Sequence, residues 1–361
     1  MRATLFSLAL FAGTSLAHPR KKASKAAYEQ ETLTLDEIHQ AALAEGGVVT
    51  VWHGGDEKNQ QDYLKQAFEA RFPDMTLNIT VDLSKYHDTN INTQLAEKSV
   101  YVDSVILQTS HNFPRWKDEG ALLNYAPLHF DNISSVFKDK DAAYTGVYIF
   151  ALSIQGSTDK TASLPKSFKD FTKPEYKDKL VLVYPNDDDA ILWQFDLLLE
   201  DPEYGMKWFD ALLANNPRWV RGTATAPTII KDANSDRLAT FTSVHSFAPA
   251  PAGYSDELST EGTFVSWAQN GAILKDAPHP EGAKLLLNYL LSDEYQVNFG
   301  WSPREDIAPP AGVETILKQP RTHAAGFAEF MSNRAKVERR RFFYESKLHT
   351  AQGISPLEDE L

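Results

Sequence analysis

Short apolar runs alternate with longer stretches of helical periodicity along most of the chain. Residues 48–52 (VVTVW) form a continuous run rich in β-branched side chains, which is typical of a strand buried on both faces of a parallel sheet. Helical periodicity follows over residues 56–71, and the same order returns as predicted strands at 77–81 and 103–107 around a predicted helix at 88–98. This alternation predicts an open, mostly parallel α/β sheet with helices on both faces.

A helix is also predicted ahead of the first strand. Thr34 and Glu37 have the spacing of a capping box, in which each side chain accepts a hydrogen bond from the other residue's backbone amide. Apolar residues then recur at helical spacing until Gly46 and Gly47, where the pattern stops. We expect this helix to begin just after Thr34 and to end before the glycine pair.

The same order of elements restarts in the second half of the chain. Strands are predicted at 180–184 and 238–243 and a helix at 191–199, and the segment 147–154 joins the two halves. Two such stretches predict two α/β lobes with a ligand cleft between them. The expected division is residues 33–150 with 265–312 for the first lobe, 151–264 for the second, and 313–361 for a C-terminal helical extension and tail.

The stretch from residue 270 to residue 296 (NGAILKDAPHPEGAKLLLNYLLSDEYQ) combines a strand, a break and a helix. The predicted strand, residues 272–275, is expected to re-enter the first lobe. Pro280 suits the first helical position because its missing amide hydrogen would have no partner there. The helix then presents an apolar stripe to the core, and Ser292 is expected to cap the helix that follows.

Four junctions at which a predicted strand ends form the expected ligand site. In open α/β sheets, small ligands bind at the carboxyl ends of the strands, where loops lead to the free backbone amides of helix N-termini. Two lobes that face each other would bring the four junctions to one cleft. The candidate ligand-binding residues come from these junctions, with the addition of an arginine that can clamp an anionic group. They are Trp52, His53, Ser110, His111, Asn186, Asp187, Asp188, Arg221, His245 and Ser246.

The acidic and aromatic candidates leave more than one role open. The run of aspartates at residues 187–189 either caps the exposed amides of the next helix or pairs with a cationic group or a metal. Trp52 beside His53 suits stacking on a ring or a cation, and equally suits a core tryptophan with a solvated histidine. The basic run at residues 339–341 is expected to form a solvated helix face.

The histidines and arginines allow further alternatives. His53, His111 and His245, together with an aspartate, can form a transition-metal site, although no short ligand spacing supports one. Arg218 and Arg221 flank a tryptophan and can clamp a carboxylate or phosphate, whereas a plain surface position is the commoner role of such arginines. The identity of any metal therefore stays open.

The composition narrows the range of partners. The 361 residues carry a formal net charge of −13, which disfavours nucleic acid and anionic membranes. The absence of cysteine from the sequence removes disulfides, thiolate chemistry and a lipid-anchored cysteine. Beyond the first 17 residues, no segment reaches the roughly 18 consecutive apolar residues of a spanning helix. We expect a monomer with no stable membrane anchor.

The ends of the chain carry targeting signals. Residues 1–17 predict a signal peptide, and residues 18–32 form a basic and polar leader with a candidate dibasic processing site. Secretion is therefore expected, to the periplasm if the host is a bacterium. Asn78 and Asn132 lie in sequons and are candidate glycosylation sites in a eukaryotic host. The terminal EDEL resembles an endoplasmic-reticulum retrieval signal, with Glu in the usual place of Lys or His.

Four stretches carry a resemblance to a known family. They are EGGVVTVWHGG, AEKSVYVDSVILQTS followed by WKDEGALLNYAPL, PKSFKDFTKPEYKDKLVLVYP, and AILKDAPHPEGAKLLLNYLLSDEYQ. In this order they resemble the type 2 periplasmic solute-binding proteins, in particular the iron(III) and thiamine branch of ABC-transporter substrate-binding components, over residues 33–312. The resemblance implies the two-lobed type II fold, a small molecule or ion trapped by hinge closure, no cofactor and no chemistry. It also implies an ABC importer as membrane partner in a bacterium, and none in a eukaryote.

The chain departs from the iron-binding members of that family. Those members use adjacent tyrosines, whereas Tyr144, Tyr184 and Tyr254 of this chain are scattered and no two tyrosines are adjacent. Iron is therefore not named as the ligand. Two alternatives to a transport-type binding protein remain: a secreted hydrolase that uses two cleft carboxylates, and a metal-binding or scavenging protein.

Overall fold

Helix α1 (Leu35–Glu45) begins and ends as the sequence predicts. The Thr34 hydroxyl accepts a hydrogen bond from the Glu37 amide at 3.3 Å, and the Glu37 carboxylate accepts one from the Thr34 amide at 2.8 Å. The predicted capping box is therefore confirmed. Gly46 follows with a φ of 131°, a backbone conformation that L side chains rarely adopt, and this ends the helix.

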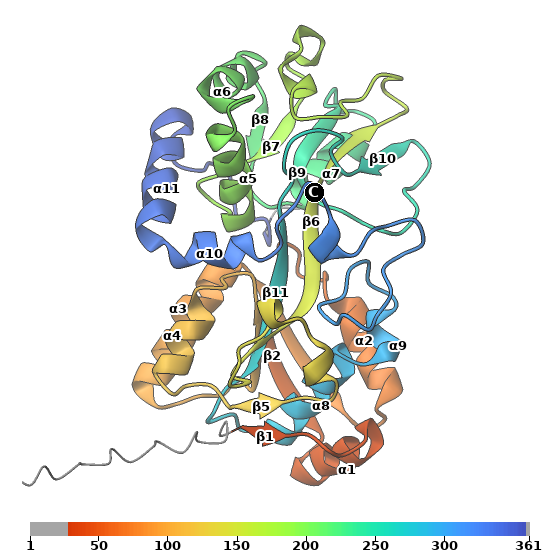
Figure 1. Ribbon diagram of the computed structural model, residues 1–361, viewed down its shortest axis with the longest axis vertical. Coiled ribbons are helices and arrows are strands. Elements are labelled where there is room, and N and C mark those ends of the chain that lie inside the picture. The colour runs from red at the N-terminus through yellow and green to blue at the C-terminus, as the bar shows by residue number, and fades with distance from the viewer. Residues whose placement is uncertain (1–27, 359–361) are drawn as a thin grey trace, which may run out of the picture.

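The first lobe is built on parallel strands (Figure 1), in a computed structural model that describes residues 28–358. Strand β2 (Val48–Gly54) lies between β3 (Thr76–Asp82) and β4 (Ser104–Leu107) and pairs in parallel with both. The helices of this region are α2 (Asp62–Arg71), α3 (Ser84–Glu97) and α4 (Asn112–Asp118).

Two of these helices begin away from the predicted positions. Helix α2 begins at Asp62 instead of residue 56, because the Gln60 side chain accepts hydrogen bonds from the Asp56 and Glu57 amides and holds a loop there. Helix α3 begins at Ser84, ahead of the predicted residue 88. The loop before α2 lies at the end of a central strand, where ligands bind in folds of this kind.

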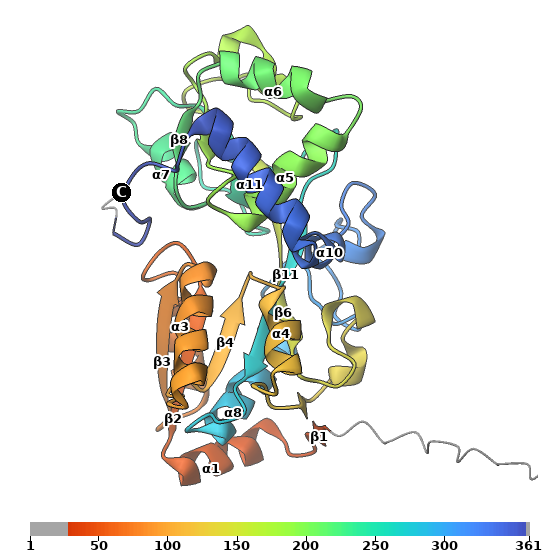
Figure 2. The same cartoon turned by 90° about the vertical axis from the view of Figure 1, so that its left-hand side faces the viewer.

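Two long antiparallel strands run between the lobes, as Figures 1 and 2 show. Strands β6 (Thr145–Ser157) and β11 (Ser266–Ile273) pair with each other, and β11 also pairs with β4 of the first lobe. In the second lobe, β6 pairs with β9 (Ala239–Val244) and β10 (Tyr254–Glu257). One mixed sheet therefore passes through both lobes, where the sequence pattern predicts a mostly parallel sheet in each.

The strand predicted at residues 272–275 begins earlier, at Ser266. Gln269 and Asn270 interrupt the apolar run in the sequence, yet both side chains are buried inside the strand. Gln269 donates to the Gly54 carbonyl at 3.3 Å, which compensates for its burial. Because these two buried residues are polar, the hydrophobicity pattern of the sequence does not predict this part of the strand.

The second lobe packs helices around a pair of parallel strands. Strands β7 (Val181–Val183) and β8 (Arg218–Val220) pair in parallel, and the first of them leads into α5 (Asp189–Glu200). The core is aromatic: Phe195 contacts the rings of Phe209 and Phe241. Helices α6 (Gly205–Ala214) and α7 (Thr225–Lys231) also belong to this lobe.

The stretch from residue 270 to residue 296 lies against the helix and strand that open the first lobe. Helix α8 (Pro280–Leu290) has Pro280 at its first position, and it packs on α1 and β2 with its apolar stripe buried. The Ser292 side chain accepts a hydrogen bond from the Tyr295 amide and caps α9 (Asp293–Gln296), which confirms the predicted cap.

A C-terminal extension completes the second lobe. Helices α10 (Gly326–Ser332) and α11 (Arg334–Leu348) follow the single turn η5 (Ile316–Lys318), and Figure 2 shows α11 lying across α5. Tyr344 of α11 is fully buried against Phe195 and Phe209. The short elements elsewhere are β1 (Glu29–Gln30), β5 (Tyr125–Ala126), η1 (Phe130–Asn132), η2 (Ser135–Phe137), η3 (Asp170–Thr172) and η4 (Pro174–Tyr176).

Several predictions concern the ends and the surface of the chain. The predicted signal peptide, most of the basic leader, and the last three residues of EDEL lie outside the described residues. Within residues 28–358, the helices are too short or too polar for any of them to cross a membrane. Asn78 and Asn132 are both exposed, and the Asn132 side chain donates to Asp306 at 2.6 Å. Glycosylation of the two sites remains a prediction.

Candidate functional site

A cavity of about 530 Å³ lies between the two lobes. Its first-lobe wall comes from the loops after β2 and β4 and from the start of α3, and its second-lobe wall comes from the loops around α5, α7 and β10. The connecting strands β6 and β11 contribute Phe150, Gln155, Trp267 and Gln269. This volume suits a small organic molecule.

The first-lobe wall depends on close packing at the end of β2. A Cβ atom on Gly54 would lie 2.0 Å from the Ser84 hydroxyl, so only glycine lets α3 approach the strand this closely. The same hydroxyl accepts a hydrogen bond from the Gln108 amide at 3.0 Å, which fixes the end of β4 beside the start of α3. The three segments therefore form one preorganised surface of the cleft.

The three consecutive aspartates of the second-lobe wall have three different roles. Asp187 pairs with Lys85 and Arg221, each at 2.7 Å. Asp188 caps α5, where its carboxylate accepts hydrogen bonds from the amides of residues 190 and 191 at 2.9 and 3.0 Å. Asp189 pairs with Arg341 of α11 at 2.5 Å. The acidic run thus caps a helix and binds cationic side chains at the same time.

The environment shifts the pKa values of these carboxyl groups in opposite directions. Burial would raise the pKa of Asp187, but the hydrogen bonds and charges of Arg221 and Lys85 outweigh it and lower that pKa. Burial, followed by the charge of Asp56, raises the pKa of Asp188 to about 7. Burial also raises the pKa of Asp56. Two carboxyl groups of the cavity are therefore costly to ionise.

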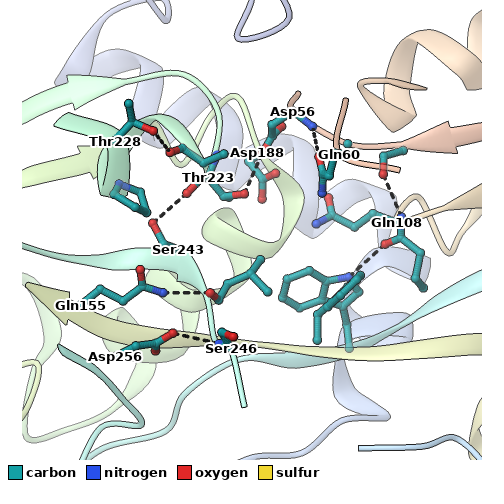
Figure 3. A pocket seen from close by; sticks show the side chains of 18 of the residues that line it. Asp56, Gln60, Gln108, Gln155, Asp188, Thr223, Thr228, Ser243, Ser246 and Asp256 are labelled. Atoms are coloured by element: carbon teal, nitrogen blue, oxygen red, sulfur yellow. Dashed lines mark hydrogen bonds between the residues drawn. The ribbon is translucent and has the colours of Figure 1, made fainter. Parts of the chain in front are cut away.

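Side chains bond directly across the cleft (Figure 3). The Asp56 carboxylate accepts hydrogen bonds from the Thr223 amide at 2.7 Å and from the Thr223 hydroxyl at 2.6 Å. Lys85 donates to the Asp187 carboxylate at 2.7 Å and to its carbonyl at 3.0 Å. Asp56 and Lys85 belong to the first lobe and their partners to the second. The two lobes are therefore held together over the cavity.

Polar and aromatic side chains of the connecting strands form the remaining wall. Gln155 donates to the Val244 carbonyl at 2.8 Å and accepts a hydrogen bond from the Tyr254 hydroxyl at 2.9 Å. The Phe150 and Trp267 rings lie 5.7 Å apart, measured between their centroids. This wall combines fixed amide groups with two aromatic rings that are tilted 55° to each other.

Comparison with known families identifies the chain. The sequence profile described as "Bacterial extracellular solute-binding protein" matches residues 103–302, which is more than half of the chain. The chain belongs to this family. The match confirms the predicted resemblance to solute-binding proteins and the predicted secreted location. No curated protein sequence matches the chain.

Solved structures of solute-binding proteins share the two-lobed fold. A substrate-binding protein of an ABC transporter from Agrobacterium tumefaciens aligns with a TM-score of 0.70 at 10% identity, over 84% of this chain and 95% of that one. AfuA from Actinobacillus pleuropneumoniae, with exogenous fructose-6-phosphate bound, aligns with a TM-score of 0.63 at 17% identity, over 84% of this chain and 99% of that one. Iron-bound HitA from Pseudomonas aeruginosa aligns with a TM-score of 0.55 at 15% identity, over 81% of this chain and 99% of that one. The predicted fold is confirmed.

Three of the ten candidate residues line the cavity of this solute-binding protein: Asp187, Asp188 and Ser246. Arg221 adjoins the cavity through its ion pair with Asp187. His245 lies behind it, where its Nδ1 bonds the Asp256 carboxylate at 2.8 Å. These residues come from the second lobe.

The other candidates lie outside the cavity lining. Trp52 is buried and stacks on His87 with 5.0 Å between the ring centroids. His53 is buried, its Nδ1 bonds the Gly54 carbonyl, and burial lowers its pKa to about 4, so the ring is neutral. The Asn186 side chain donates to the His349 carbonyl. Ser110 is buried and His111 is half-buried at the start of α4.

The three histidines do not form the metal site that their residue types allowed. Across residues 28–358, no group of three or more His, Cys, Asp or Glu side chains is placed to hold a metal ion. His53 bonds the backbone of its own strand, whereas His245 bonds Asp256 and packs edge-on against Phe247. The hypothesis of a site made from His53, His111 and His245 is therefore wrong.

Several lining residues were not predicted from the sequence. Asp56 directly follows the junction predicted at residues 52–55, so the position of that junction was the available signal. Trp267 sits on a strand whose start was misplaced. Arg341 was expected on a solvated helix face. It instead lines the cavity, where it forms an ion pair with Asp189 at the start of α5.

Proposed function

We propose that this solute-binding protein traps one small polar organic molecule between its lobes by hinge closure and releases it unchanged. The observation that carries the proposal is the pair of direct contacts across the cavity, Asp56 with Thr223 and Lys85 with Asp187. Such contacts can form only when the lobes are close, so they stabilise the closed form. Strands β6 and β11 are the elements that would bend.

The solute is proposed to contact residues from both walls and from the connecting strands. A ligand that touches both lobes binds the closed form more tightly than the open form, and this difference shifts the population towards closure. The neighbours in the structure comparison carry different cargo, iron in HitA and fructose-6-phosphate in AfuA. The fold alone therefore does not define the solute, and its class has to come from the side chains of this cavity.

In a bacterial host, the closed form would pass its solute to the membrane component of an ABC importer. In a eukaryotic host no such importer is expected, and the same trapping would serve scavenging, sensing or delivery. The protein is proposed to act as a monomer, because each wall of the cavity comes from the same chain.

We propose no chemical step on the solute. A hydrolase would need cleft carboxylates free to exchange protons with a substrate. The carboxylates of Asp56 and Asp188 instead accept hydrogen bonds from the chain itself, from Thr223 and from the amides at the start of α5. These bonds favour a positional role for both groups.

Native mass spectrometry combined with small-angle scattering tests this function. We expect a small molecule to co-purify with the protein. The radius of gyration should increase when this molecule is removed and should fall to its original value when the molecule is added back. The recovered molecule should have the same mass after prolonged incubation. A radius of gyration that does not respond to a bound solute would contradict hinge closure, and steady conversion of the solute would contradict the absence of chemistry.

A further inference from the structure

The charged side chains that line the cavity do not balance one another. Asp56, Asp187, Asp188, Asp189 and Asp256 carry carboxylates, whereas Lys85, Lys231 and Arg341 carry cationic groups. Most of these groups already have a partner within the chain. The partners of the acidic residues are Lys85 and Arg221 for Asp187, Arg341 for Asp189, and His245 for Asp256.

Two carboxylates are left without a cation. Among the described residues, neither Asp56 nor Asp188 has a lysine, arginine or histidine nitrogen within 4.0 Å, and both receive hydrogen bonds only from neutral groups. Figure 3 shows the two side chains next to each other at the same part of the cavity. Like charges brought together in a partly desolvated site destabilise each other.

The two carboxylates come from opposite lobes. Asp56 lies in the loop after β2 of the first lobe, and Asp188 lies at the start of α5 in the second. Closing the cleft therefore brings two negative charges together, and this repulsion opposes closure. A cation between them would turn the repulsion into attraction from both sides, which would couple its binding to closure.

A buried hydroxyl and an aromatic wall point to a ligand in the same cavity. Thr109 lines the cavity and is only 3% exposed, and its hydroxyl oxygen is buried without a hydrogen-bond partner in the described part of the chain. A buried hydroxyl without a partner destabilises a protein unless a ligand or water completes it. Trp267 and Phe150 add two aromatic rings, tilted 55° to each other, and the face of an aromatic ring suits a cationic group.

The cationic side chains do not offer an equivalent site for an anion. Lys85 is held by Asp187, and Arg341 is held by Asp189 and Glu338. Lys231 is exposed and lies over the Tyr254 ring, with its nitrogen 4.6 Å from the ring centroid. A single exposed lysine binds an anion weakly compared with a paired arrangement.

We infer that the solute carries a positively charged nitrogen, an ammonium or amidinium group, held between Asp56 and Asp188 while its remainder lies against Trp267 and Phe150. This inference rests on the proposed function, since it assigns a ligand class to the same cleft. The Thr109 hydroxyl accepts from or donates to a polar group of the same solute. Binding of the cation across the lobes is then the trigger for closure.

Three probes of nearly equal shape test the inference by isothermal titration calorimetry at pH 8. Tyramine carries the cation, tyrosol is its neutral analogue, and 4-hydroxyphenylacetate is the anionic one. We expect tyramine to bind at least about tenfold more tightly than either analogue. We expect Asp56→Asn and Asp188→Asn each to reduce tyramine affinity about tenfold or more, with tyrosol affinity changed less than about twofold. Asp236→Asn, on an exposed aspartate of the second lobe outside the cavity, is the matched control and should change neither.

Specific results would overturn the inference. Equal or tighter binding of tyrosol or 4-hydroxyphenylacetate contradicts a cation site, as does tyramine affinity that both asparagine variants leave unchanged. Failure of tyramine to bind at about 10 mM also contradicts it. None of these results touches the proposed function, which stands or falls on compaction with the solute that co-purifies. Circular dichroism of each variant excludes misfolding as the cause of lost affinity.

Discussion

At the scale of single residues, Asp188 combines two roles that the sequence presents as alternatives. It caps α5, as acidic residues commonly do after a strand, and it also lines the cleft beside Asp56. The sequence could place an acidic residue at this junction. It could not show which of three adjacent aspartates would lack a cationic partner, because Lys85, Arg221 and Arg341 come from distant parts of the chain.

The raised pKa of Asp188 predicts how stability depends on pH. In the unfolded chain the group titrates near its ordinary value of 3.8, whereas in the solute-free folded protein its pKa is about 7. The folded state therefore binds the extra proton between these values, and the free energy of unfolding falls as the pH rises from about 4 towards 7. The charged groups that act on Asp188 are Asp56, Asp187, Asp189 and Arg341.

The variant Asp188→Asn should remove this dependence. Asparagine keeps the helix cap but cannot ionise. We therefore expect the free energy of unfolding of the variant, relative to that of wild type, to be about 1–2 kcal/mol higher at pH 8 than at pH 5. This value is discounted because the side chain is partly exposed. Urea unfolding of both proteins at the two pH values measures it. A difference between variant and wild type that is the same at pH 5 and pH 8 would show that Asp188 does not titrate in this range. Asp236→Asn is again the control.

At the scale of elements, the chain predicts most helices and strands from local patterns. The capping box at Thr34, the proline that begins α8 and the cap at Ser292 each depend on neighbouring residues only, and all three are confirmed. Strand β11 was misplaced because Gln269 is buried through a bond to the first lobe, which no local pattern contains. Local sequence patterns therefore fail to predict an element when a buried polar side chain in it is hydrogen-bonded to a residue far away in the sequence.

Helix α11 is the element whose role was least visible in the sequence. Its basic residues suggested a solvated face, but Lys336 pairs with the buried Asp196 at 2.7 Å and Arg341 reaches the cavity. The helix is thus a structural part of the second lobe. Its orientation fixes Arg341 beside the aspartates of the cleft.

Substitution of Tyr344 tests the anchoring of α11. The ring is fully buried against Phe195 and Phe209, so Tyr344→Ala should reduce the free energy of unfolding by about 3–5 kcal/mol. Tyr344→Phe keeps the ring and removes a buried hydroxyl that has no hydrogen-bond partner among the described residues, so it should be neutral or slightly stabilising. Thermal and urea unfolding of the two variants measures both effects. A destabilised Phe variant would mean that the hydroxyl has an unrecognised partner, and an unaffected Ala variant would mean that α11 is not anchored here.

At the scale of the whole molecule, the two-lobed fold was predictable and the contacts across the cleft were not. The alternation of strands and helices, together with the stretch that returns to the first lobe, indicated two lobes around a cleft. The pairing of Asp56 with Thr223 joins residues far apart in the sequence, and it depends on the relative position of the lobes. Only the assembled structure brings such residues together.

Because the sequence contains no cysteine, introduced cysteines can be labelled specifically, and closure of the two lobes around the solute can be measured directly. Cysteines introduced at Glu97 of the first lobe and Lys207 of the second, both exposed and outside the cavity, can be labelled with a donor and an acceptor dye. Single-molecule energy transfer then reports the distance between the lobes. We expect two populations without solute, and a shift to the closer one when the co-purified solute is added. A single distance that stays unchanged while calorimetry shows the solute to be bound would contradict trapping by hinge closure.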